Sequence, residues 1–366
     1  MKRSLFLALA LCLLVLAGAE AWLHRHLFQH VSYSNSASID AQLRERDSGP
    51  RWKMLFVGDS EVHWGVDPEQ VDAGFRDAGR ETLAFNHAFD GFGASWWPSL
   101  LPGLLEAPAL REVDTVVVGV QLTDYLRLMR PSGEDCGGLQ RPVLTSPFAV
   151  DLHADGLCRT RTWDAQLGRD LFGGLWTVRY ASAVRTLLLP QAFFSSPHLA
   201  LNSRSDGPPR RGFQPHRTLA QDKASYESEF RRWKAQFDPE RDFQPIAPGA
   251  WQKLVVDGGF FDALQQTVER SGRRLALYAV PTNPVVIDTF HRRANYAENS
   301  ALLAAWAARR GVVFVDLGLQ DRPDADQYFS DMRHLSGVGA RDFSRRLGRA
   351  LAQPTPVRGP EARDGR

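Results

Sequence analysis

Residues 54–60 read Met-Leu-Phe-Val-Gly-Asp-Ser, a short apolar run that ends in three residues favouring turns. Such a run, bounded by a turn signal, is typical of a strand buried on both faces of a parallel sheet. In an open parallel sheet, ligands bind at the carboxyl ends of the strands. The stretch therefore predicts a first strand with Ser60 at the functional edge of the sheet.

Further apolar runs follow along the chain and alternate with segments of helical character. The predicted strands cover residues 82–85, 115–118, 275–280 and 312–315. The predicted helices begin with Asp67 as N-cap and Pro68 at the first helical position, and cover residues 93–105, 294–310 and 337–351 later in the chain. This alternation predicts an α/β fold, a parallel sheet with helices on both faces.

The alternating pattern breaks between about residues 130 and 248, where turn and loop signals accumulate. We expect an insertion here within one domain over residues 51–352. Cys136 and Cys158 lie in the insertion, and a pair of cysteines in an oxidising compartment predicts a disulfide, with two unrelated thiols as the alternative. The tail over residues 353–366 carries three prolines and several charges, which predicts disorder.

The N-terminus has the pattern of an export signal. Two basic residues at positions 2–3 precede an apolar run over residues 5–17. The run is shorter than the roughly 20 residues of a membrane span, but it can be extended to residue 23. Residues 1–23 are therefore either a cleaved signal peptide or a membrane anchor, with a buried core helix as a third reading. We expect a stalk over residues 24–50 and a location on the periplasmic side of the cell envelope.

The composition excludes some classes of function. The chain has 366 residues, of which 43% are hydrophobic, so it can bury a full core. Its formal net charge of +2 provides no basic field for nucleic acid. His24, His26 and His30 lack acidic or cysteine partners, which favours solvated side chains over a metal site. We expect no metal, no cofactor and no nucleic-acid partner.

A second loop carries the groups that a serine nucleophile needs. Asp331 and His334 follow the last predicted strand and precede the closing helix. A serine hydroxyl is a weak nucleophile without a base, and the base is itself oriented by a carboxylate. Because both loops meet the same edge of the sheet, we expect His334 to serve as the base for Ser60 and Asp331 to orient its ring.

Gly58-Asp59-Ser60 and Asp331-x-x-His334 resemble the motifs of the SGNH, or GDSL-like, hydrolases. The resemblance covers about residues 51–125 and 250–352. It implies a flavodoxin-like three-layer α/β/α sandwich in which the Asp-x-x-His pair supplies the acid and the base of the triad.

The resemblance also implies an oxyanion hole made by the nucleophile's N–H, a glycine after strand two and an asparagine after strand three. Residues 86–91 resemble the second block and place Gly91 in the glycine role. The third block departs from the family, because Thr123 stands where the asparagine belongs. We expect Gln121 or Thr123 to supply the donor, whose loss typically costs about a hundred- to a thousandfold in rate.

An exported chain with a large insertion resembles two branches of this family, the periplasmic polysaccharide O-acetyltransferases and the envelope esterases associated with D-alanine transfer. The resemblance implies acyl transfer on a cell-envelope glycan through an acyl-Ser60 intermediate, and a membrane protein that delivers the acyl group. The alternatives are a lipolytic esterase or thioesterase, and an inactive glycan-binding protein of the same fold. Trp96 and Trp97 follow the second block and are either a stacking surface for the substrate or part of the core.

Overall fold

The computed structural model describes residues 10–22, 52–88, 97–106, 110–122, 259–290, 293–319, 325–331 and 333–353, with scattered residues between 213 and 252. The predicted stalk, the predicted disulfide and the predicted disordered tail beyond residue 353 lie outside these residues, as does most of the predicted insertion. Of the predicted site residues, Gly91 and Thr123 also lie outside them.

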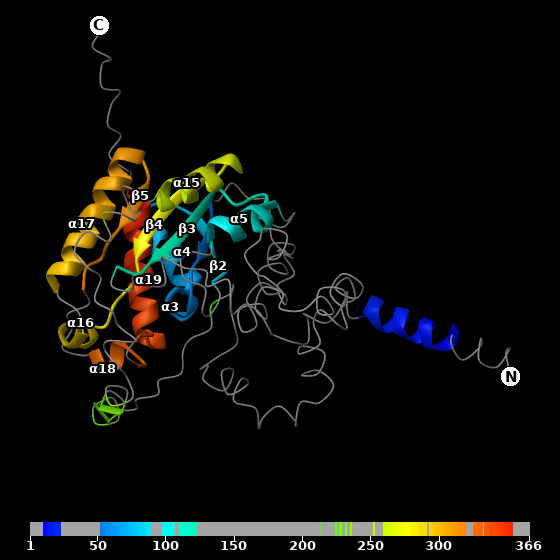
Figure 1. The fold of residues 1–366 in the computed structure, drawn as a ribbon, viewed down its shortest axis with the longest axis horizontal. Helices are drawn as coiled ribbons and strands as arrows, with labels where there is room; N and C mark the ends of the chain where they lie inside the picture. The colour runs from blue at the N-terminus through cyan, green and yellow to red at the C-terminus, as the bar shows by residue number, and fades with distance from the viewer. Residues whose placement is uncertain are drawn as a thin grey trace, which may run out of the picture.

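Five parallel strands form a single sheet that lies between the labelled helices (Figure 1). They are β1 (Trp52–Val57), β2 (Thr82–Asn86), β3 (Thr115–Val120), β4 (Arg274–Ala279) and β5 (Val313–Val315). Their order in the sheet is β2-β1-β3-β4-β5, which is the flavodoxin-like order. The predicted α/β fold class is thereby confirmed, and the order of the strands reverses between β1 and β3.

Helices cover both faces of this sheet (Figure 1). In chain order they are α3 (Ser60–Gly65), α4 (Pro68–Asp77), α5 (Trp97–Glu106), α15 (Phe260–Arg270), α16 (Pro284–Phe290), α17 (Arg293–Arg310), α18 (Ala325–Tyr328) and α19 (Gly337–Ala352). Side chains alternate along each strand, so Leu55 and Val57 join one core while Met54 and Phe56 join the other. The first core is closed by α5, α15 and α17, and the second by α3, α4, α18 and α19.

Local sequence signals account for where several of these elements begin and end. Asp67 caps α4 as predicted, because its Oδ1 accepts the backbone N–H of Glu69 at 3.0 Å, and Pro68 occupies the first helical position. Trp97 is fully buried in the first core and is a core residue. It therefore presents no exposed ring face to a substrate.

The described part of the N-terminal run is helical over residues 10–22, and several of its leucines are exposed. Across the described ranges, no helix combines the length and the apolar character needed to cross a membrane. The choice between a signal peptide and an anchor stays a prediction.

Candidate active site

The turn after β1 places a serine at the carboxyl edge of the sheet. Asp59 is the N-cap of α3, with extended backbone angles, and its Oδ1 accepts the backbone N–H of Glu61 at 2.9 Å. Ser60 is the first residue of the helix and remains partly exposed. The N–H groups of the first helical turn have no acceptor within the helix, so the Ser60 N–H is available to an acceptor from outside it.

Two glycines allow α3 to lie close against the ends of the central strands. A Cβ atom on Gly58 would come within 2.2 Å of Val62 Cγ2, and one on Gly119 within 2.4 Å of the same atom. Contacts this short do not occur between real carbon atoms, so any larger residue would push α3 away from the sheet. The absence of side chains at these two positions therefore sets the height of Ser60 above β1 and β3.

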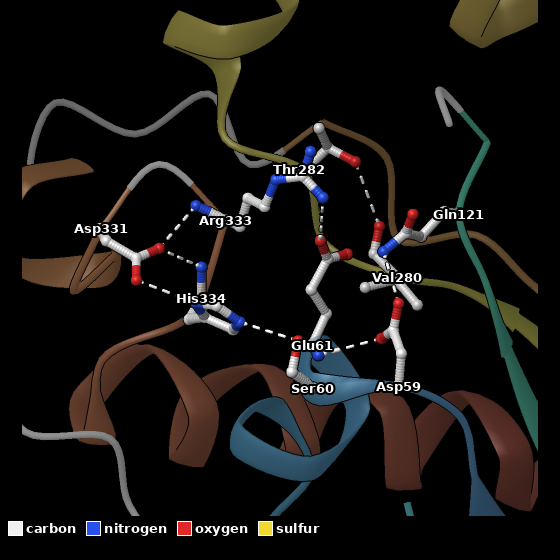
Figure 2. A network of polar contacts seen from close by, with 9 residues as sticks. All are labelled: Asp59, Ser60, Glu61, Gln121, Val280, Thr282, Asp331, Arg333 and His334. Atoms are coloured by element: carbon white, nitrogen blue, oxygen red, sulfur yellow. Dashed lines mark hydrogen bonds and ion pairs between the residues drawn. The ribbon is translucent and has the colours of Figure 1, made fainter. Parts of the chain in front are cut away.

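The loop before α19 brings a histidine and a carboxylate to the same serine (Figure 2). His334 Nε2 lies 3.0 Å from Ser60 Oγ, and His334 Nδ1 lies 2.8 Å from Asp331 Oδ2. An ionised carboxylate only accepts hydrogen bonds, so Nδ1 carries the ring proton and Nε2 presents its lone pair to the hydroxyl. The three residues predicted to work together thus lie in a continuous hydrogen-bonded series.

Backbone contacts fix the shape of the loop around His334. The backbone N–H and the hydroxyl of Ser330 both donate to the carbonyl of His334, at 2.9 and 3.1 Å. Phe329 and Leu335 form an antiparallel bridge beside them, and the Ser336 hydroxyl caps α19 by accepting from the N–H of Gly339. These hydrogen bonds and the bridge therefore hold the turn from which the imidazole projects.

The Asp331 carboxylate is held in its ionised form. Desolvation by the surrounding protein opposes ionisation. The positive charge available on the His334 ring, its hydrogen bond, and the backbone N–H groups of His334 and Arg333 outweigh that effect. These contacts hold the pKa of Asp331 well below its ordinary value of 3.8. Asp331 is therefore an acceptor for the imidazole across the neutral pH range.

Two further side chains connect the loop to the rest of the site. Asn283, fully buried after β4, donates from its amide to the carbonyl oxygen of Asp331 at 3.4 Å. Arg333 Nη1 lies 3.9 Å from the carboxylate of Glu61, the residue after the serine (Figure 2). The loop thus contacts both the turn between β4 and α16 and the start of α3.

Gln121 lies directly after β3, on the other side of the nucleophile turn. Its Nε2 donates to Asp59 Oδ2 at 2.8 Å, and both residues are buried. The amide nitrogen predicted as an oxyanion donor thus contacts the residue before Ser60. Gly91 and Thr123, the other two predicted donors, lie outside the described residues, and their roles stay predictions.

Sequence reasoning missed the bracing roles of Gln121, Asn283 and Arg333. The available signal was the position of the two amides after predicted strands, Gln121 directly after β3 and Asn283 in the turn between β4 and α16, at the edge where the site was expected. Within the ranges that the structure describes, no group of three or more His, Cys, Asp or Glu side chains is placed to hold a metal ion. A cavity of about 450 Å³ lined by Trp52, Arg80 and Arg274 lies at the amino ends of the strands, away from Ser60.

Comparisons with known proteins add little to this geometry. No protein-family model and no curated protein matches the chain. Among solved structures, the chain is similar to the lipase Lip_vut3 from a goat rumen metagenome, at 10% identity and a TM-score of 0.34, over 82% of this chain and 97% of that chain. A likeness this low carries no argument about activity. The fold class rests on the strand order, and the candidate site rests on the distances around Ser60.

Proposed function

We propose that the protein is a serine-dependent acyl-transfer enzyme of the SGNH type, with Ser60 as nucleophile, His334 as general base and Asp331 as the group that orients the base. One observation carries the proposal, the unbroken series of contacts from Ser60 Oγ through the His334 ring to the Asp331 carboxylate. A hydroxyl, an imidazole and a carboxylate arranged in this way are the components of an activated serine.

The chemistry follows from this arrangement. Ser60 Oγ attacks the acyl carbonyl while its proton passes to His334 Nε2, and the carbonyl oxygen becomes an oxyanion. The tetrahedral intermediate collapses to acyl-Ser60, and the same proton leaves with the departing alcohol. A second hydroxyl, from water or a sugar, then loses its proton to His334 and attacks the acyl-enzyme. As the bond to Ser60 breaks, His334 returns that proton to Ser60 Oγ, and the free acid or the new ester leaves. Asp331 stays ionised throughout and stabilises the imidazolium.

The oxyanion needs donors that are already in place before charge develops. The backbone N–H of Ser60 is one such donor, because it begins α3 and has no acceptor within the helix. Gly91 and Thr123 remain our proposed further donors, on the strength of the family resemblance. An oxyanion hole built around a backbone N–H is compatible with Thr123 standing where the SGNH family has an asparagine.

We further propose that the acyl acceptor is a cell-envelope glycan and that transfer to it predominates over hydrolysis. The predicted export signal and the long predicted insertion after β3 support this choice, since both suit a bulky acceptor on the periplasmic side of the envelope. Holding an acceptor hydroxyl in line can alone contribute several kcal/mol to the choice between a sugar and water. A membrane partner that supplies the acyl group belongs to the same proposal.

The test supplies an activated acetyl ester to the full-length protein, with and without envelope oligosaccharides. Transfer predicts that the sugar accelerates loss of the ester and that mass spectrometry detects acetylated sugar, with neither effect in Ser60→Ala. Free acetate as the sole product, unaffected by sugar, would instead support the esterase or thioesterase alternative. Sugar binding without Ser60-dependent ester turnover would identify a glycan-binding protein.

A further inference from the structure

The carboxylate of Asp59 joins two elements on either side of the nucleophile (Figure 2). Its Oδ1 accepts the N–H of Glu61 in α3 at 2.9 Å, and its Oδ2 accepts Gln121 Nε2, beyond the end of β3, at 2.8 Å. Asp59 is 4% exposed and Gln121 is 9% exposed, so water has little access to this contact. The residue before the nucleophile is therefore anchored to the helix and to the strand at once.

Replacing Gln121 would take one hydrogen-bond donor away from the buried carboxylate of Asp59. Burying a carboxylate oxygen is costly unless it is hydrogen-bonded, so the loss of this donor favours a reorientation of the Asp59 side chain. Reorientation would weaken its second contact, the cap on Glu61, which sets where α3 begins. The position of Ser60 Oγ relative to His334 Nε2 depends on that starting point.

We infer that Gln121 is a positioning residue that acts on Ser60 through Asp59, and that it does not donate to the substrate's oxyanion. The inference rests on the proposed serine-dependent function and revises the role that the sequence predicted for this amide. Among the described residues, Gln121 Oε1 is buried without a hydrogen-bond donor. The side chain is thus oriented by the single described contact that its nitrogen makes with Asp59.

A positioning role and an oxyanion-donor role for Gln121 can be separated by exchanging the hydrogen-bond donor and acceptor between Gln121 and Asp59. Gln121→Glu places two carboxylates against each other. Asp59→Asn keeps the cap, since Asn and Asp are equivalent N-caps, and the Gln121 amide can turn its oxygen toward the new donor. The double variant D59N/Q121E restores one donor and one acceptor in reversed order, but leaves no side-chain N–H at position 121.

The measurements are kcat and KM on a neutral aryl acetate, the rate of labelling by a fluorophosphonate, and the melting temperature. We expect Q121E to lower kcat by roughly a hundredfold with KM little changed, as a misplacement of about 1 Å can do. D59N should lower kcat only a few fold, and the kcat of D59N/Q121E should return to about that of D59N.

Gln265→Glu provides a matched control, since Gln265 Nε2 also donates to a carboxylate, that of Glu269, on the exposed surface of α15. We expect Gln265→Glu to leave turnover unchanged. Gln121→Leu removes the contact without adding charge and keeps the test valid if Q121E fails to fold. An oxyanion role predicts that D59N/Q121E stays as inactive as Q121E, and that result, or full activity in both Q121E and Q121L, would overturn the inference. Failure of the proposed function is separately visible, as a wild-type protein without Ser60-dependent turnover.

Discussion

His334 Nε2 and Ser60 Oγ lie 3.0 Å apart although 274 positions separate the two residues in the chain. The serine is placed by the first strand and the glycines under α3, and the histidine by the turn before the last helix. The two ends of the domain must therefore be folded together before a base can face the nucleophile.

Asp331→Asn should abolish most of the turnover without unfolding the protein. An amide in place of the carboxylate no longer enforces the tautomer in which Nε2 faces Ser60, and it cannot stabilise the imidazolium. We expect kcat to fall roughly ten-thousandfold. Because the members of a triad act as a unit, adding His334→Ala should cost little more. Strictly additive losses on an aryl acetate would show that the two residues do not act in one relay.

The same carboxylate makes a testable contribution to stability. Its pKa is lower in the folded chain than its ordinary value of 3.8, so the folded form is favoured when Asp331 is ionised. This contribution is complete above about pH 5 and is lost as the pH falls through the acidic range. The difference in unfolding free energy between wild type and Asp331→Asn, measured by urea denaturation, should shrink as the pH is lowered. A difference that grows on acidification would contradict the assigned ionisation state.

Gly119→Ala tests whether the close approach of α3 positions the nucleophile. The new methyl group would overlap Val62 and come within 3.0 Å of the Tyr278 hydroxyl, so the helix must move. We expect a destabilisation of about 1–3 kcal/mol and slower acylation of Ser60. Gly65→Ala, within α3 itself, is the matched control. Its methyl group would meet Leu335 Cδ1 at an ordinary 3.7 Å, so α3 need not move. Equal effects of the two variants on acylation would rule out this positional role.

Asn283 combines two contacts that substitution can separate. Its Oδ1 caps α16 by accepting the N–H of Val285 at 3.0 Å, and its amide donates to the Asp331 carbonyl. Asn283→Ala should lower the free energy of unfolding by about 1 kcal/mol through loss of the cap, and should also lower kcat. Asn283→Ser keeps a capping oxygen but loses the amide donor, so we expect the melting temperature to recover more than kcat. Recovery of both together would mean that the Asp331 contact is dispensable.

The fold class was predictable because its strands are short apolar runs between turn signals, and the same pattern placed Ser60, Asp331 and His334 at strand or loop exits. The hydrogen bond between the Gln121 amide and the Asp59 carboxylate was not predictable from such a pattern. It depends on the register of β1 against β3, in which Val57 pairs with Val118. In that register β3 continues two residues beyond the end of β1, so Asp59, two residues after Val57, lies level with Val120, the last residue of β3. Sequence spacing alone does not determine the register of parallel strands separated by a long crossover.

The role of Asn283 was hidden for a related reason. Asn before Pro284 is an ordinary turn signal, and its second contact, to a carbonyl 48 positions away, arises only when the loop before α19 folds back over β4. The close packing at Gly58 and Gly119 is similarly a property of the assembled helix and sheet. Tertiary contacts, rather than local propensity, therefore complete the candidate site.

Labelling of the intact protein by a fluorophosphonate tests the central claim most directly, because the reagent reacts only with a serine that a neighbouring base has activated. Ser60→Ala is the test variant, and Ser271→Ala, at the end of α15 near the amino ends of the strands, is the control. We predict stoichiometric labelling of wild type and of Ser271→Ala, a modified peptide containing Ser60 by mass spectrometry, and no labelling of Ser60→Ala or His334→Ala. Equal labelling of Ser60→Ala and wild type, or no labelling of wild type, would contradict the assignment of Ser60 as an activated nucleophile.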